Sequence, residues 1–183
     1  VLFNPLFEQE DGSYKMDFAH LEQLIAHEPK ARLLILSNPH NPAGILWDKE
    51  TLQRLAHICS QHGILVISDE IHCDMALWGK RHVPFASVSD EAARNSITFG
   101  APSKTFNIAG IVSSYAVVPD EQLRERFFGW VEANELNMST FFADIATMAA
   151  YKKGEEWRQQ MLHYVEGNIE FVEDYLKANI PQI

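Results

Sequence analysis

The chain has few cysteines and no long apolar segment. Its 183 residues include only two cysteines, Cys59 and Cys73, so a framework of several disulfides is excluded and nothing indicates an oxidising compartment. No apolar run approaches the roughly 18 residues that a membrane-spanning helix needs. No charged segment followed by an apolar one marks a secretory leader. We therefore expect a cytoplasmic protein that does not enter a membrane.

Basic residues are also scarce. Lys and Arg total 15 against 25 Asp and Glu, which gives a formal net charge of -10 without a basic stripe. Binding to a phosphate backbone depends on clustered Lys and Arg, so nucleic acid is not an expected partner. A content of 46% apolar and 22% charged residues is typical of a globular domain. The chain opens on Val1, and we expect it to be part of a longer protein.

Short apolar runs alternate with amphipathic stretches along the chain. This pattern is typical of βα units and predicts an α/β fold with a mostly parallel sheet. The expected strands are 32–37, 64–68, 96–99 and 113–118. The expected helices are 18–27, 48–63, 88–94, 121–135, 140–152 and 155–179.

The helix between the first two strands has clear boundary signals. Asp48 is placed as its N-cap, Trp47 and Leu52 can form a hydrophobic staple, and Gly63 ends it. Cys59 lies on its apolar face, where a small hydrophobic side chain is expected. The last helix has an apolar stripe that predicts packing into a core. The residues of this stripe are Trp157, Met161, Tyr164, Val165, Val172, Tyr175 and Leu176.

Three loops that follow expected strands contain polar residues suited to chemistry. The first, 38–44, has two Asn-Pro steps and includes Asn41; the second begins with Asp69; the third, 101–110, contains Lys104. Loops at the carboxyl ends of parallel strands meet at the edge where open α/β sheets bind ligands. A lysine amine there is placed to attack a carbonyl group.

Two other sites fit the residues less well. Residues 100–105 end in Lys-Thr like a nucleotide-binding phosphate loop, but Ser103 and Thr98 stand where that motif requires glycine. A metal site is conceivable from ligand type alone, but the spacing of the candidates is poor. These candidates are His57, Cys59, His62, His72 and Cys73.

Three motifs in register resemble a known family. Asn41-Pro-Ala-Gly is followed 28 positions later by Asp69-Glu-Ile-His, and Ser103-Lys104-Thr-Phe-Asn-Ile-Ala-Gly places the lysine 35 residues beyond the aspartate. Their order and spacing resemble the fold-type-I pyridoxal phosphate (PLP) enzymes of the class I/II aminotransferase superfamily. His72, where most aminotransferases have tyrosine, is similar to the cystathionine β-lyase-like branch of C-S lyases.

The resemblance implies a role for each motif residue. Lys104 is expected to hold PLP as a Schiff base and to move the substrate Cα proton. Asp69 is expected to pair with the pyridine nitrogen, and Asn41 and His72 to bind the phenolic oxygen of the ring. Ser103 is a candidate ligand of the phosphate. The Asn41–Pro42 bond is a candidate cis peptide.

The resemblance also implies an architecture and its missing parts. We expect a three-layer α/β/α PLP-dependent transferase-like large domain over residues 1–183, with an N-terminal part and a C-terminal small domain outside the chain. Ala101 and Val112 stand where many relatives have a serine and an arginine that bind the phosphate. The resemblance leaves Ser103, Ser113 or Ser114, or a glycine-rich loop upstream of this chain, as the phosphate ligands. The arginine that binds the substrate carboxylate is expected beyond Ile183.

Three functions remain open from sequence. The first is a PLP-dependent C-S β-lyase that acts on a small amino-acid substrate such as cystathionine, in a homodimer. The second is a class I/II aminotransferase, because the same residues serve both reactions. The third is a catalytically silent fragment or regulatory binding module, because the stacking and carboxylate-binding residues lie outside the chain.

Overall fold

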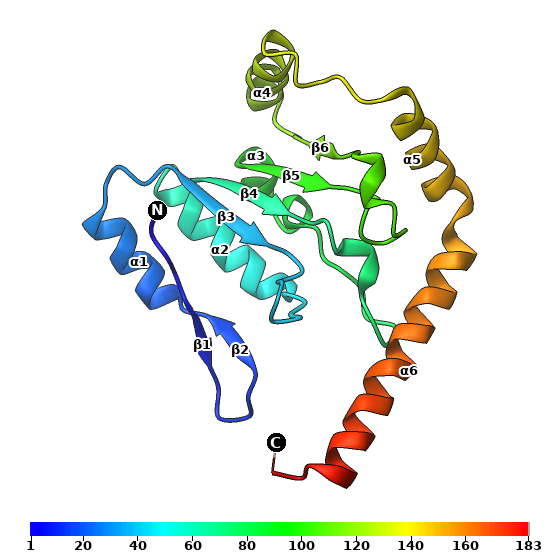
Figure 1. Ribbon diagram of the computed structural model, residues 1–183. Coiled ribbons are helices and arrows are strands. Elements are labelled where there is room, and N and C mark those ends of the chain that lie inside the picture. Colours follow the sequence, from blue (N-terminus) through cyan, green and yellow to red (C-terminus); the bar gives the residue numbers. More distant parts are fainter. Residues whose placement is uncertain (183) are drawn as a thin grey trace.

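The computed structural model describes residues 1–182 and shows a mixed α/β fold (Figure 1). Its strands are β1 (Leu6–Glu8), β2 (Tyr14–Met16), β3 (Leu33–Ser37), β4 (Leu65–Asp69), β5 (Ser96–Gly100) and β6 (Tyr115–Val117). Its α-helices are α1 (Phe18–His27), α2 (Lys49–Gln61), α3 (Asp90–Arg94), α4 (Glu121–Ala133), α5 (Phe141–Lys153) and α6 (Glu155–Asn179). Single turns of 3-10 helix are η1 (Cys73–Met75), η2 (Phe85–Ser87) and η3 (Ala109–Ile111).

The main sheet has four strands in the order β3-β4-β5-β6. β3, β4 and β5 are parallel, and β6 is antiparallel to β5. The predicted mostly parallel sheet is therefore confirmed, with strand boundaries that differ from the expected ones by at most two residues. A small antiparallel hairpin, β1-β2, pairs Leu6 with Met16 and was not predicted from the sequence.

Helix α2 connects β3 to β4 and forms as its boundary signals predict. The Asp48 side chain accepts a hydrogen bond from the Thr51 backbone N–H at 2.7 Å, which satisfies one of the free donors at the start of the helix. Gly63, just past the end, has a φ of 62°, a left-handed conformation that favours glycine. This crossover fixes β3 and β4 side by side and in parallel.

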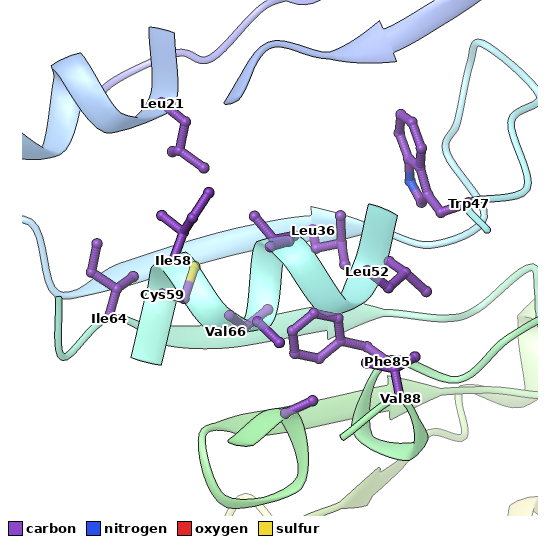
Figure 2. Close-up of a cluster of buried hydrophobic side chains, with 13 residues drawn as sticks. Leu21, Leu36, Trp47, Leu52, Ile58, Cys59, Ile64, Val66, Phe85 and Val88 are labelled. Carbon is purple, nitrogen blue, oxygen red and sulfur yellow. The ribbon is translucent and has the colours of Figure 1, made fainter. Parts of the chain in front are cut away.

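The main hydrophobic core lies between one face of the sheet and the helices α1, α2 and α3. Leu36 of β3 and Val66 of β4 point into it and meet Leu52 of α2 and Phe85 of η2 (Figure 2). Cys59 is also fully buried there, as predicted for a small hydrophobic side chain. Burial of a large apolar side chain contributes about 1.5–3 kcal/mol, so this cluster is the main source of rigidity beneath the strand ends.

The opposite face of the sheet is covered over β5 by α4. The rings of Phe99 in β5 and Phe127 in α4 pack edge to face, with centroids 5.8 Å apart. Helices therefore lie on both faces, as the three-layer prediction requires. Over β3 this face is open within residues 1–182, because Leu33 and Ile35 are 50% and 72% exposed.

The prediction for the stripe of α6 was wrong. Leu162 is the buried residue of this helix, whereas Tyr164, Val172 and Tyr175 are more than half exposed. In Figure 1, α6 lies beside the loops that follow β4 and β5, and its C-terminal part extends away from the sheet. Apolar periodicity predicted the helix and its apolar side, but not whether this chain covers that side.

Candidate active site

The carboxyl ends of β3, β4 and β5 bring the three polar loops to one edge of the sheet. Ser37 of β3 pairs with Asp69 of β4, and Asp69 pairs with Phe99 of β5. Asn41 follows Ser37 by four residues and Lys104 follows Phe99 by five. The three motif residues thus leave the sheet on neighbouring strands, at the edge where ligands bind in folds of this type.

The Asn41 loop is held by hydrogen bonds at both of its ends. The Asn41 backbone N–H donates to Ser37 Oγ at 3.1 Å, and the His40 N–H donates to the Ile45 carbonyl at 2.8 Å. Asn41–Pro42 is a cis peptide, as predicted, and Asn38–Pro39 is a second one that was not predicted. The loop leaves the Asn41 side chain exposed.

Asp69 and Glu70 are neighbours in sequence but lie in different environments. Asp69 ends β4 and is exposed, and its Oδ1 accepts a hydrogen bond from the Ile71 N–H at 3.2 Å. Glu70 is only 4% exposed. Side chains alternate across a strand, so Glu70 continues the buried side of Ser68 while Asp69 remains on the opposite side.

The buried Glu70 carboxylate is the centre of a polar network. Its Oε1 accepts hydrogen bonds from Ser68 Oγ and the Phe85 backbone N–H, both at 2.8 Å, and its Oε2 lies 2.7 Å from His82 Nε2. Asn38 Nδ2 donates to Oε1 at 3.4 Å and to the Val83 carbonyl at 3.1 Å. This network was not predicted from the sequence. The available signal was a second acid directly after a buried strand, which needs partners.

His72 lies at the start of η1 and borders a cavity next to the Asn41 loop. The cavity has a volume of about 640 Å³, and its lining includes Asn41, His72, Tyr14 and Trp78. Asn41 and His72 therefore line the same cavity, although they lie in loops that follow different strands. Burial raises the pKa of the adjacent Cys73 thiol to about 12, so this cysteine stays protonated and is a poor nucleophile.

Lys104 lies on a tight turn after β5. The Phe106 N–H donates to the Pro102 carbonyl at 2.9 Å, and the Ile108 N–H donates to the Ser103 carbonyl at 3.0 Å. Pro102 and Thr105 are buried, whereas Lys104 is exposed. The turn is thus fixed by its backbone and its buried flanks, and it presents the amine to the outside.

The three serines considered for phosphate binding differ in what they contact. Ser113 Oγ accepts a hydrogen bond from Thr147 Oγ1 at 2.8 Å, so it is occupied by α5. Ser103 is half-buried within the lysine turn, and Ser114 is exposed. Ser103 and Ser114 therefore have surface to offer a ligand.

No metal centre is formed by the part of the chain that the structure describes. Within residues 1–182, no three His, Cys, Asp or Glu side chains are grouped closely enough to hold an ion. The described helices also include none that is both long and apolar enough to cross a membrane.

Comparisons with known proteins identify the family of this chain. The sequence profile of the aminotransferase class I and II family matches residues 6–181. The chain is 44% identical to cystathionine beta-lyase PatB of Bacillus subtilis (strain 168) over 183 residues, which is all of this chain and 47% of that protein. It is 31% identical to the protein MalY of Escherichia coli (strain K12), over 97% of this chain and 45% of that one.

A solved structure gives the same result. A PLP-bound protein from Clostridium difficile 630, assigned as an aminotransferase, superposes with a TM-score of 0.92 and is 42% identical, over 98% of this chain and 46% of the other. The chain thus spans about half the length of the relatives it matches. With the profile matching nearly the whole chain, the protein belongs to the aminotransferase class I and II family.

Proposed function

We propose that the protein containing this chain is a PLP-dependent C-S β-lyase. The single observation that supports it best is the emergence of Asn41, Asp69 and Lys104 from three adjacent parallel strands at one sheet edge. An exposed amine, an exposed carboxylate and an exposed amide there suit the aldehyde, the pyridine nitrogen and the phenolic oxygen of PLP. The residues of this chain therefore fit the cofactor.

In this proposal each residue acts on a defined atom. Bound PLP supplies an electron sink for the negative charge that develops on the substrate Cα. Lys104 would hold the cofactor through its aldehyde, and its amine would take the Cα proton of the bound substrate. Asp69 holds the proton on the pyridine nitrogen, because a nearby carboxylate favours the charged form. Asn41 and His72 donate hydrogen bonds to the phenolic oxygen.

The reaction of a β-lyase follows from loss of that proton. The Cα–H bond breaks, the electron pair expels the sulfur at Cβ as a thiolate, and hydrolysis of the remaining fragment gives pyruvate and ammonia. Cystathionine and other cysteine S-conjugates have this sulfur. His72 supports the lyase branch, and the relative named cystathionine beta-lyase PatB is similar over all of the chain.

An aminotransferase is the second candidate. It is favoured by the Clostridium difficile structure assigned as an aminotransferase, whose 42% identity is close to the 44% of the lyase PatB. The two reactions use the same residues until the proton has left Cα. They would differ in whether a thiolate leaves from Cβ or the amino group is passed to a keto acid.

The domain extent, the oligomeric state and the cellular location of the protein are also proposals. We infer that residues 1–183 are most of a PLP-binding large domain and that the protein is a homodimer. An exposed apolar surface around the start of α5 supports the dimer, because Met138, Phe141 and Phe142 are 82%, 75% and 73% exposed. Both cysteines are free thiols, which suits a cytoplasmic location.

The test uses the full-length protein purified with PLP. Borohydride reduction followed by digestion and mass spectrometry should place the cofactor mass on Lys104, and the Lys104→Ala protein should not carry it. A Lys152→Ala protein is the matched control, because Lys152 is an exposed lysine of α5. Attachment to a different lysine would refute the proposal.

The products distinguish the two candidate reactions. Incubation with cystathionine should release pyruvate, ammonia and a thiol in equal amounts without an added keto acid. An aminotransferase would instead need a keto acid for turnover and would form a new amino acid from it. Turnover that depends on the keto acid would replace the lyase by the second candidate.

A further inference from the structure

The lysine turn is in contact with the junction of two helices. Phe106, two residues after Lys104, packs edge to face against Tyr151 of α5, with ring centroids 5.5 Å apart. It also lies against Trp157 of α6, with centroids 6.0 Å apart. Lys104 itself is exposed, so its position depends on the backbone of this turn and on the side chains that anchor it.

The glycine between the two helices makes room for this contact. A Cβ at Gly154 would lie 2.6 Å from Phe106 Cε1 and 2.4 Å from the Ala150 carbonyl oxygen. Both separations are below any normal carbon contact. The helix junction and the Phe106 ring are therefore fitted to each other, and the ring cannot keep this position if the junction carries a side chain.

The same cluster extends to the beginning of the lysine segment. The Tyr115 ring covers Gly100, the last residue of β5, and a Cβ there would lie 2.4 Å from the Tyr115 ring carbon Cζ. Tyr115 also contacts Tyr151, with centroids 6.2 Å apart. Burial raises the pKa of both phenols, so the two rings remain neutral at the pH where enzymes of this kind work.

Helix α6 also holds the segment that follows His72. Arg158 Nη1 donates to the Asp74 carbonyl at 2.9 Å, and the Glu166 carboxylate accepts a hydrogen bond from the Trp78 backbone N–H. Trp78 has a φ of 52°, a strained conformation for a bulky residue that needs such support. The early part of α6 thus contacts the loops after both β4 and β5.

We propose that Phe106, Tyr151 and Trp157 form an aromatic brace that positions Lys104 for the cofactor, with Gly154 required for its fit. The brace holds the turn at Phe106. The Lys104 amine thereby keeps a fixed position relative to Asp69 and His72. Its members are positioning residues, since they act on Lys104 through the turn that Phe106 anchors. The inference rests on the proposed function for the role of Lys104 toward the cofactor. The contacts of Phe106 with Tyr151 and Trp157 do not depend on that function.

The test compares three variants of the full-length protein. Trp157→Ala removes one wall of the brace, Trp157→Phe restores a ring, and Phe171→Ala removes an aromatic ring of α6 that is 70% exposed and far along the helix. The first measurement is hydrogen exchange of peptide 101–108 in the protein without cofactor. We expect about tenfold faster exchange in Trp157→Ala, and exchange within about twofold of wild type in the other two.

The second measurement is the pH midpoint of the absorbance of the lysine–cofactor adduct. A displaced Lys104 should move this midpoint by at least about half a pH unit in Trp157→Ala and leave it in place in the two other variants. A merely structural loss would lower stability without moving the midpoint. Equal loop exchange and equal midpoints in Trp157→Ala and Phe171→Ala would overturn the proposal.

General destabilisation by Trp157→Ala and failure of the proposed function can each be distinguished from failure of the brace. If Trp157→Ala loses protection in β3 and β4 as well, Tyr151→Leu replaces it and the same two measurements decide. If the wild-type protein forms no adduct with Lys104, the proposed function fails, while the loop exchange in the cofactor-free protein still decides whether the brace exists.

Discussion

The Glu70 carboxylate and the His82 imidazole lie 2.7 Å apart in the interior of the domain, where their side chains are 5% and 8% exposed. The pair joins the end of β4 to the segment before η2, and Glu70 also binds the Phe85 N–H and the Asn38 amide. Asp69, the proposed partner of the pyridine nitrogen, directly precedes Glu70. Glu70 is therefore a buried anchor next to the proposed site.

Removing the anchor should destabilise the fold strongly. Glu70→Ala leaves several buried donors without an acceptor, and the loss of one member of a buried pair typically costs about 3–5 kcal/mol. Urea unfolding of the full-length protein measures this change. Glu173→Ala, which breaks an exposed pair with Lys177, should cost less than about 1 kcal/mol. Equal effects of the two substitutions would contradict the assignment of Glu70 as an anchor.

Replacing Asp69 should impair catalysis rather than folding. Asp69→Asn keeps the shape of the side chain but removes the charge that holds the pyridine proton, and we expect kcat for pyruvate release to fall by about 100-fold or more. The unfolding free energy should change by less than about 1 kcal/mol, because Asp69 is exposed. Asp90→Asn, in the first turn of α3, is the control. An Asp69→Asn enzyme with kcat near wild type would exclude the proposed role.

Cys59 should make the protein less stable at alkaline pH. Burial raises the pKa of its thiol from 9.0 to about 12, so between these values the unfolded state loses a proton that the folded state retains. Stability from this group is complete below pH 9 and falls above it, by about 1.4 kcal/mol per pH unit. Cys59→Ala should lower stability at pH 7 but reduce the decline between pH 9 and 10.5, as measured by urea unfolding. An unchanged decline would mean that the thiol ionises in the folded protein.

Gly100 should not tolerate a side chain. Gly100→Ala forces a methyl group into the Tyr115 ring and should cost about 1–3 kcal/mol. The double variant Gly100→Ala/Tyr115→Ala should recover part of this loss, which thermal unfolding measures. Gly129→Ala in α4 is the matched control, since no atom lies within 4 Å of its Cβ position and alanine favours the helix. No difference between the two glycines would argue against the close contact.

The residues at the strand ends were predicted from the sequence, whereas the contacts that hold those ends in place were not. Asn41, Asp69 and Lys104 were placed together because the carboxyl ends of parallel strands share one edge, a rule that needs no knowledge of packing. The partners of Glu70 could not be predicted, because His82 and the Phe85 N–H reach it only through the path of the chain after β4. The aromatic brace depends likewise on where α5 and α6 pack.

The limits of periodicity are clearest in α6 and in the first hairpin. The spacing of apolar residues predicted the 25-residue helix with its observed bounds, but Tyr164 and Val172 remain exposed. β1 and β2 have three residues each, too few for an alternating pattern to be recognised. Both cases depend on contacts between segments rather than on local preference.

The length of α6 has a mechanical consequence. Twenty-five residues at 1.5 Å each make a rod of about 37 Å, so a tilt of about 5° at its first turn displaces the far end by about 3 Å. Conversely, a displacement of a few ångströms at the far end corresponds to a rotation of only about 5° where Trp157 contacts Phe106. The helix is therefore a lever, in which a few ångströms at the far end correspond to about 0.4 Å at Trp157, beside the lysine turn.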